Sequence, residues 1–173
     1  QIISGNSKDA ITSAKNLFSV LGVNCIETPT IEGAELIKLF NNTYRDVQFA
    51  IGNFFNEIAQ QYRLNGSQLI KIANQDYARP DIAKPGLVGG PCLEKDPFIL
   101  TGSFSNQSYI PKLFIAGREV NESITSVAVD YIFNRTKNKN DPKICILGMA
   151  FKGLPPTGDV RGSVARQLVG ELR

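Results

Sequence analysis

Residues 31–62 read IEGAELIKLFNNTYRDVQFAIGNFFNEIAQQY, and this stretch decides the fold. Its apolar residues follow helical periodicity and occupy more than one face of the expected helix. A helix of this kind, about thirty residues long, measures roughly 45 Å at 1.5 Å per residue. One small bundle offers too little surface to cover it. We therefore predict that a second copy of the chain packs along residues 31–62 and forms a homodimer.

The sequence before and after this helix predicts further elements. Residues 1–30 predict a short strand, a helix from Lys8 to about Leu21 and a second strand ending at Pro29, which is an α/β arrangement. Apolar spacing predicts further helices over about 67–75 and 115–134. The middle of the chain is therefore expected to be all-helical.

The C-terminal part returns to an α/β pattern. Residues 143–151 predict a buried strand, which a turn-rich stretch joins to a helix from about Ser163. This is the pattern of the first strand, loop and helix of a nucleotide-binding-type domain, although no Gly-x-Gly-x-x-Gly spacing is present.

The predicted fold class is α/β overall, with an all-helical central dimerisation domain at 31–136. It is flanked by the end of one Rossmann-like domain at 1–30 and the start of a second at 137–173. Both chain ends fall inside predicted elements, so we expect a piece of a longer protein.

Composition excludes several classes of function. The 173 residues contain no histidine, which removes the usual partner of serine and cysteine nucleophiles and the commonest metal ligand, so no metal site is expected. The net charge of +3 is mild and scattered, and no apolar run approaches the ~20 residues of a membrane span. We therefore expect neither a nucleic-acid nor a membrane partner. Three cysteines without paired spacing favour a reducing compartment, the cytoplasm.

A polar stripe runs along the long helix. Glu35, Lys38, Asn42 and Arg45 follow at helical spacing on one face. A buried lysine beside an amide can stabilise an oxyanion, because the ammonium supplies charge and the amide a directed donor. The alternative is a solvated face with a Glu35–Lys38 ion pair, and spacing alone does not decide between them.

Cys92 lies in a loop of different character, residues 85–97, which read PGLVGGPCLEKDP and are called the cysteine loop below. Its glycines, Gly89 and Gly90 among them, let the backbone approach a ligand closely, and a nearby lysine could favour the thiolate. If Cys92 begins a helical turn, Asp96 lies on the same side of it. The alternative is a Gly/Pro connection with an incidental cysteine. Cys25 and Cys145 stand in strand-like surroundings and are expected to be buried and structural.

These motifs resemble the UDP-glucose/GDP-mannose dehydrogenase family. The resemblance rests on GAELIKLFNNT at 33–43, GGPCLEKDP at 89–97, and GMAFK at 148–152 followed by TGDVRGS at 157–163. The motifs stand in the family's order and cover most of the chain. Glu94 and residues 152–157 look more like the branch that acts on UDP-N-acetylhexosamines, such as UDP-N-acetylmannosamine, than like the UDP-glucose form.

The resemblance implies an NAD-dependent oxidation of a UDP-sugar C6 alcohol to the uronate through a thioester on Cys92. It implies that Lys38 and Asn42 stabilise the developing oxyanion and that Asp96 positions or deprotonates water. The other roles it implies are dinucleotide phosphate contacts for Lys95 and Arg161, uridine diphosphate contacts for Phe151 and Lys152, and a contact to the neighbouring subunit's sugar for Arg79.

Two alternatives stay open at this stage. One is a β-hydroxyacid dehydrogenase-type enzyme, which shares a Lys-x-x-x-Asn helix but uses no thioester. The other is a catalytically idle dimerisation module. Because most of the family's two outer domains is missing from the sequence, we expect the chain to be inactive by itself.

Overall fold

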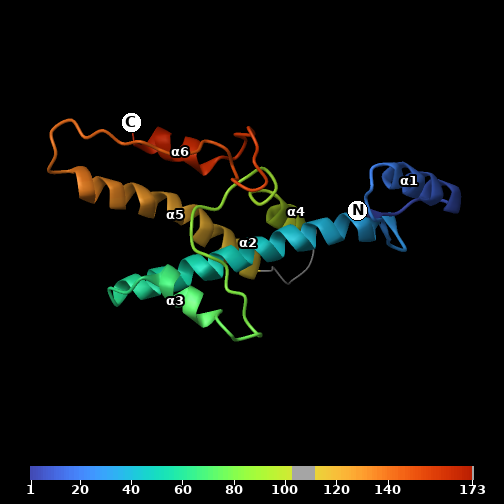
Figure 1. Ribbon diagram of the computed structural model, residues 1–173, viewed down its shortest axis with the longest axis horizontal. Coiled ribbons are helices and arrows are strands. Elements are labelled where there is room, and N and C mark those ends of the chain that lie inside the picture. The colour runs from blue at the N-terminus through green and yellow to red at the C-terminus, as the bar shows by residue number, and fades with distance from the viewer. Residues whose placement is uncertain (103–111, 173) are drawn as a thin grey trace. The chain divides into compact units, whose positions relative to one another are not determined.

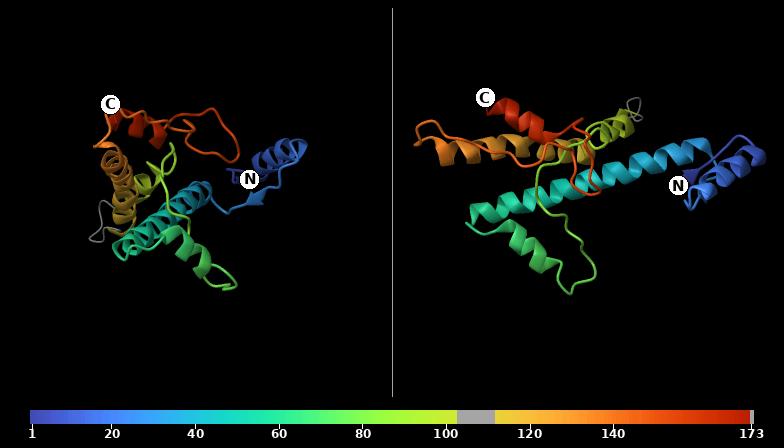
Figure 2. Two further views of the ribbon diagram at one scale, coloured as in Figure 1. Left: turned by 60° about the vertical axis from the view of Figure 1, so that its left-hand side comes forward. Right: turned by 45° about the horizontal axis from the view of Figure 1, so that its top comes forward.

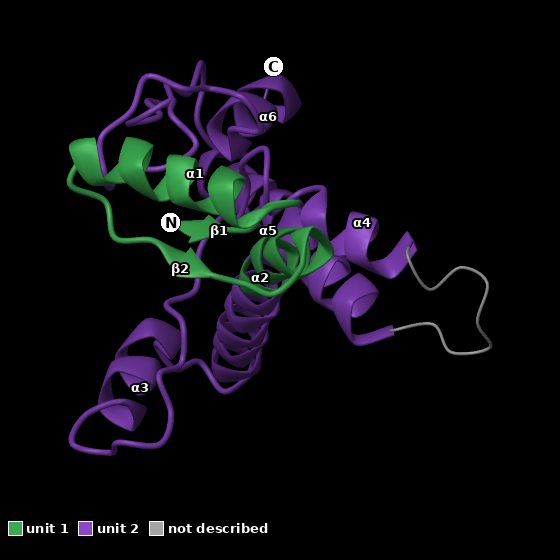
Figure 3. Cartoon of the chain, turned by 90° about the vertical axis from the view of Figure 1, so that its right-hand side faces the viewer, with its two compact units in different colours: residues 1–41 green, residues 42–173 purple. Residues whose placement is uncertain are grey.

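The computed structural model describes residues 1–102 and 112–172. The chain divides into two compact units, residues 1–41 and 42–173 (Figure 3). The division falls inside the long helix α2, Ile31–Gln61. This helix confirms the prediction over 31–62 to within one residue.

The first unit contains a small parallel sheet. Strands β1 (Ile2–Ile3) and β2 (Ile26–Glu27) pair in parallel, with Ile2 opposite Ile26, and helix α1 (Lys8–Val20) connects them. The Oγ of Ser7 accepts a hydrogen bond from the backbone N–H of Ala10, which caps the start of α1. This strand–helix–strand order confirms the predicted α/β arrangement of residues 1–30.

The second unit is helical. After α2 it contains α3 (Gly66–Ala73), α4 (Asp96–Gly102), α5 (Lys112–Thr136) and α6 (Val164–Glu171) (Figures 1 and 2). Helices α3 and α5 confirm the two predicted after residue 62. Both α4 and α6 pack against α5.

Within the second unit, α2 buries its polar side chains and exposes apolar ones, which is the reverse of a usual surface helix. Its buried positions are polar or small, and most of its large apolar side chains are exposed. The buried set is Thr43, Asp46, Ala50, Gly52, Asn53 and Ala59. The exposed set is Tyr44, Ile51, Phe54, Phe55 and Ile58, followed by Tyr62 just beyond the helix. A period of 3.6 residues gathers the exposed set into one stripe, with the buried positions on both sides of it.

The predicted strand over residues 143–151 is wrong. Residues 143–149 form neither helix nor strand, and the side chain of Leu147 is 91% exposed. A strand needs a neighbour to pair with its backbone groups, and in the described residues the only strands are β1 and β2, which pair with each other. The expected burial of Cys145 is therefore also wrong, because this thiol is exposed, and Cys25 is only half-buried.

Residues 143–163 are called the C-terminal segment below. Its part after residue 149 is held by local hydrogen bonds. The backbone N–H of Phe151 donates to the carbonyl of Asp159 at 3.0 Å, and the hydroxyl of Ser163 donates to the carbonyl of Met149 at 2.7 Å. Ser163 then precedes α6, which confirms the predicted start of that helix.

In the parts of the chain that the structure describes, no helix has both the length and the apolar character to cross a membrane.

Candidate functional site

Cys92 begins a helical turn that leads into α4. Its carbonyl accepts hydrogen bonds from the backbone N–H of Asp96 at 2.9 Å and of Lys95 at 3.3 Å. The side chain of Asp96 therefore lies one turn beyond Cys92, as the sequence predicts. The Cys92 thiol is half-buried.

The carboxylate of Asp96 is the centre of a charged cluster. It has no solvent-exposed surface, and its Oδ2 accepts a hydrogen bond from Asn42 Nδ2 at 2.6 Å. Its Oδ1 accepts one from Lys95 Nζ, also at 2.6 Å. A buried carboxylate needs such charge-assisted partners, because burial removes its hydration. The structure thus brings together Asn42 from the long helix and Asp96 from the cysteine loop.

Lys95 is a cation at the edge of this cluster. Its side chain is 58% exposed. The hydrogen bond to Asp96 raises the pKa of the Lys95 ammonium, opposed by partial desolvation and supported by the negative charges of Asp96 and Cys92. Lys95 is therefore an exposed cation that is paired with the buried carboxylate of Asp96.

Lys38 agrees with the alternative of a solvated helix face. It belongs to the first unit, and its side chain is exposed rather than buried. Glu35 and Arg45 of the same stripe are also exposed, and no ion pair joins Glu35 to Lys38 among the described residues. Of the four stripe residues, Asn42 reaches the cluster around Asp96, and the role of Lys38 at Cys92 stays a prediction.

Gly90 joins the cysteine loop to the C-terminal segment. Its backbone has φ +106, and its N–H donates to the carbonyl of Gly162 at 2.8 Å and to Glu94 Oε1 at 3.3 Å. A Cβ at this position would lie 2.7 Å from the ring of Phe151. Only glycine accommodates both this backbone conformation and so close a ring. Two predicted substrate-binding positions, Gly90 and Phe151, are therefore in contact.

Arg161 is oriented by its own loop. Its Nη2 donates to Asp159 Oδ2 at 2.7 Å and its Nε to Oδ1 at 3.0 Å, while the guanidinium stays largely exposed. This pairing lowers the pKa of Asp159 to about 2. The Asp159 hydrogen bond raises the pKa of Arg161, with a smaller contribution from the charge of Cys92. Arg161 is thus a second exposed cation, held by Asp159.

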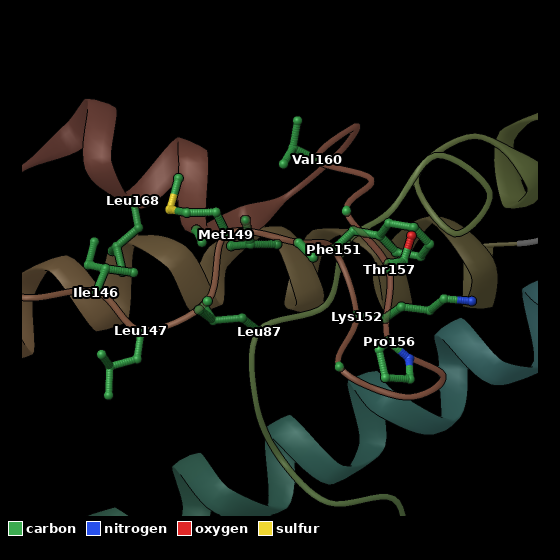
Figure 4. Close-up of a pocket in the computed structure, with 17 residues that line it drawn as sticks. Leu87, Ile146, Leu147, Met149, Phe151, Lys152, Pro156, Thr157, Val160 and Leu168 are labelled. Carbon is green, nitrogen blue, oxygen red and sulfur yellow. The ribbon is translucent and has the colours of Figure 1, made fainter.

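An open cavity of about 830 Å³ lies beside these residues. Figure 4 shows Leu87 of the cysteine loop on its wall, with Phe151 and Lys152 at one end and Leu168 of α6 at the other. Gly89 also lines it. Among the described residues that line the cavity, Lys152 alone carries a charge, and its Nζ lies 5.3 Å from the centre of the Phe151 ring. Most of the other lining side chains are apolar.

Two further predictions concern Arg79 and metal ions. Arg79 is exposed in a bend between α3 and the cysteine loop, and nothing places it at Cys92. In residues 1–102 and 112–172, no group of acidic or cysteine side chains could hold a metal ion.

Sequence reasoning missed a buried polar network in the second unit. Its members are Asp46 and Asn53 of α2 and Arg118 and Asn121 of α5. A signal for it exists, because Thr43, Asp46, Ala50 and Asn53 repeat at helical spacing, as do Arg118, Asn121 and Thr125. In the sequence, the larger apolar residues between these polar ones dominate the helical pattern, so the polar spacing is easily overlooked.

Comparison with known proteins places these features in a family. The family model described as "UDP-glucose/GDP-mannose dehydrogenase family, central domain" matches residues 32–123. The UDP-N-acetyl-D-mannosamine dehydrogenase of Pyrococcus horikoshii is 35% identical over 100% of this chain and 41% of its own length. The protein of the same name from Campylobacter jejuni is 33% identical over 99% of this chain and 41% of its own. The chain thus spans about two fifths of the length of these curated relatives.

Solved structures agree with these matches. The structure of the Pyrococcus horikoshii enzyme has a TM-score of 0.78 over 99% of this chain and 41% of that one, at 35% identity. A UDP-N-acetyl-mannosamine dehydrogenase from Staphylococcus aureus has a TM-score of 0.77 at 32% identity, over 96% of this chain and 38% of that one. Because the family model matches more than half of its residues, the chain belongs to the UDP-glucose/GDP-mannose dehydrogenase family.

Proposed function

We propose that this chain supplies the thiol and its supporting groups to an NAD-dependent nucleotide-sugar 6-dehydrogenase. The observation that carries the proposal is the arrangement at Cys92. A half-buried thiol lies one helical turn from a fully buried carboxylate, which in turn is bonded to Asn42. Two exposed cations belong to the same region: Lys95 is bonded to Asp96, and Arg161 precedes Gly162, whose carbonyl accepts a hydrogen bond from Gly90 of the cysteine loop.

The residues present fit the cofactor and the substrate. Lys95 and Arg161 are exposed cations that suit the pyrophosphate of a dinucleotide, and Arg161 is held ready by Asp159. Phe151 and Lys152 line an open cavity that suits an aromatic base and an anionic diphosphate. When bound, NAD accepts a hydride from C6 in each of the two oxidations.

The Cys92 sulfur acts between these oxidations. It adds to C6 of the aldehyde, so a carbon–sulfur bond forms as the carbonyl electron pair moves onto oxygen. Asn42, with Lys38 one turn earlier on α2, stabilises that oxygen. Loss of the second hydride leaves a thioester. Water then adds to C6, the carbon–sulfur bond breaks with its electron pair on sulfur, and the uronate is released.

Asp96 serves the hydrolytic step. Its carboxylate is one turn from Cys92 and is fixed by Asn42 and Lys95, so it can accept a hydrogen bond from the attacking water. The same contacts hold Asn42 in place for the oxygen at C6. One hydrogen-bonded cluster thus serves both the addition to the aldehyde and the hydrolysis.

Replacement of each cysteine in the intact protein tests the mechanism. Cys92→Ser removes the thiol and should lower the rate of forming two NADH per sugar by at least about a thousand-fold, with oxidation stalled at the aldehyde stage. Cys25→Ser and Cys145→Ser are matched controls and should keep the wild-type rate. An unchanged rate in Cys92→Ser would reject the thioester and favour a β-hydroxyacid dehydrogenase-type reaction.

The proposed substrate is a UDP-N-acetylhexosamine, with UDP-N-acetylmannosamine first. The curated relatives at 33–35% identity carry that activity in their names. Glu94, at which the sequence looks less like the UDP-glucose form, accepts a hydrogen bond from the backbone N–H of Gly90 within the cysteine loop. Comparison of kcat/KM for UDP-N-acetylmannosamine, UDP-N-acetylglucosamine and UDP-glucose tests this. A preference for UDP-glucose would overturn the assignment.

We also propose a homodimer through α2, with Arg79 reaching the sugar in the partner subunit. In the second unit this helix exposes an apolar stripe, Tyr44, Ile51, Phe54, Phe55, Ile58 and Tyr62. The stripe continues into an apolar cavity of about 370 Å³ between α2 and α3. A surface of this kind is stable in water when a partner covers it.

Sedimentation of the intact protein tests the dimer. Phe54→Asp combined with Ile58→Asp should give monomers at micromolar concentration. Leu147→Asp, at an even more exposed apolar position outside the stripe, should leave the dimer intact. A wild-type monomer at that concentration contradicts the proposal.

All three cysteines are unpaired thiols, which supports placing the protein in a reducing compartment, the cytoplasm.

A further inference from the structure

We propose that the buried polar network of α2 and α5 positions Cys92 by holding the cysteine loop on both sides of the thiol. Arg118 and Asn53 are the positioning residues, and Asp46 and Asn121 orient them. This inference rests on the proposed function for its consequence in catalysis. It goes beyond that function by assigning a role to residues that do not touch substrate, cofactor or the reacting atoms.

The first anchor lies before Cys92. Asn53 Oδ1 accepts a hydrogen bond from the backbone N–H of Gly86 at 2.7 Å. Gly52, beside it on α2, lets this part of the chain approach closely, because a Cβ there would overlap the carbonyl oxygen of Ala83. The loop before the thiol therefore lies directly on the backbone of α2.

The second anchor lies after Cys92. Arg118 Nη1 makes a long contact of 3.5 Å with the carbonyl oxygen of Leu93 and a short ion pair of 2.7 Å with Asp46 Oδ1. Its side chain is 2% exposed and that of Asp46 is fully buried. The guanidinium thus connects α2 to the residue next to the thiol.

The two anchors form one network. Asn121 Nδ2 donates to Asp46 Oδ1 at 2.9 Å, and Asn121 Oδ1 accepts from Asn53 Nδ2 at 3.0 Å. This chain of contacts runs from Gly86 to Leu93 through side chains that are almost fully buried. A shift of either helix therefore moves both flanks of the cysteine loop together.

Stability alone does not account for the network. A buried ion pair often adds no net stability over apolar residues of similar volume, because desolvation offsets the attraction. Directed donors and acceptors do offer something apolar side chains lack, namely partners for loop backbone groups that no helix or strand satisfies. Residues 85–90 form neither helix nor strand, yet Val88 and Gly90 within them are buried.

The test uses the reactivity of Cys92 toward iodoacetamide, measured by mass spectrometry on the intact folded protein. Cys145 is exposed and serves as the internal reference within the same molecule. The double variant Asp46→Asn/Arg118→Met removes both buried charges and keeps the acceptor for Asn121, so it should fold. Freeing the loop should raise the Cys92-to-Cys145 rate ratio about five- to tenfold.

Asn53→Ala tests the other anchor and should raise the same ratio by about fivefold. Its matched control is Asn74→Ala, because the Asn74 side chain likewise makes two hydrogen bonds, donating to the Ile82 carbonyl and accepting from the Ile82 N–H at 2.9 Å each. The control should leave the ratio within twofold of wild type. Equal acceleration in the control would assign the effect to general loosening and overturn the inference.

Kinetics in the intact enzyme give a second readout. Both network variants should lower kcat about tenfold or more with KM for the nucleotide sugar changed less than threefold, and Arg118→Lys, which keeps the charge, should restore part of kcat. An unchanged alkylation ratio in folded network variants would overturn the inference. Alkylation needs no turnover, so this outcome is distinct from the failure of Cys92→Ser to stall oxidation, which overturns the proposed function.

Discussion

The cysteine loop and the C-terminal segment differ in burial, and in each region the burial is the reverse of what its composition suggests. The loop is rich in glycine and proline, yet Val88, Gly90 and Asp96 are buried in it. Residues 143–149 are mostly apolar, yet all but Ile146 are exposed, and they form no strand. The difference lies in backbone partners. Side chains of α2 and α5 supply them to the loop, while no neighbouring strand supplies them to residues 143–149 within the described chain.

Arg118→Met alone should cause the largest loss of stability, because it removes a side chain that holds the cysteine loop. It removes the guanidinium and leaves the carboxylate of Asp46 buried without its cation, which should cost about 3–5 kcal/mol of unfolding free energy. Chemical denaturation measures this value. A loss below about 1 kcal/mol would mean that Asp46 finds another partner, and that the loop is not held through this pair.

Gly52→Ala should have the next largest effect. The new Cβ would overlap the carbonyl oxygen of Ala83, so the loop must move away from α2, at a cost of about 1–3 kcal/mol. Gly153→Ala is the matched control, since a Cβ there meets no atom within 4 Å. Equal stability of the two variants would show that the loop does not rest on the helix.

Paired truncations compare the two regions directly. Val88 is 9% exposed and Leu147 is 91% exposed. Val88→Ala should cost about 1–2 kcal/mol, because two buried methyl groups are removed. Leu147→Ala removes more apolar surface but should change stability by less than about 0.5 kcal/mol. If Leu147→Ala costs as much as Val88→Ala, the C-terminal segment has a packed neighbour after all.

The smallest expected effect is the acid titration of Asp159. Arg161 lowers its folded pKa to about 2 from an ordinary 3.8. The pair should therefore contribute stability above the ordinary value, and that contribution should disappear as the pH falls through about 2. Carboxyl NMR should report this midpoint, and Arg161→Gln should move it upward. A wild-type midpoint at the ordinary value would show that Arg161 is not held.

The sequence predicts the helices well because their periodicity is local. Apolar spacing predicts α2, α3 and α5 to within about three residues at each end and also the start of α6, and the Cys92 turn follows from the residues around it. The family also follows from short motifs that contain Cys92, Asn42 and Asp96. Each of these signals lies within a few residues along the chain.

Other features required the tertiary structure. The contact between Asn42 and Asp96 joins residues 54 positions apart, and the ion pair between Asp46 and Arg118 joins residues 72 apart. The exposure of Leu147 depends on whether a neighbouring strand is available, which its own sequence does not specify. Local sequence thus determined the helices and the reactive residues. Only packing between distant segments decided which polar groups are buried, and therefore what holds the cysteine loop in place.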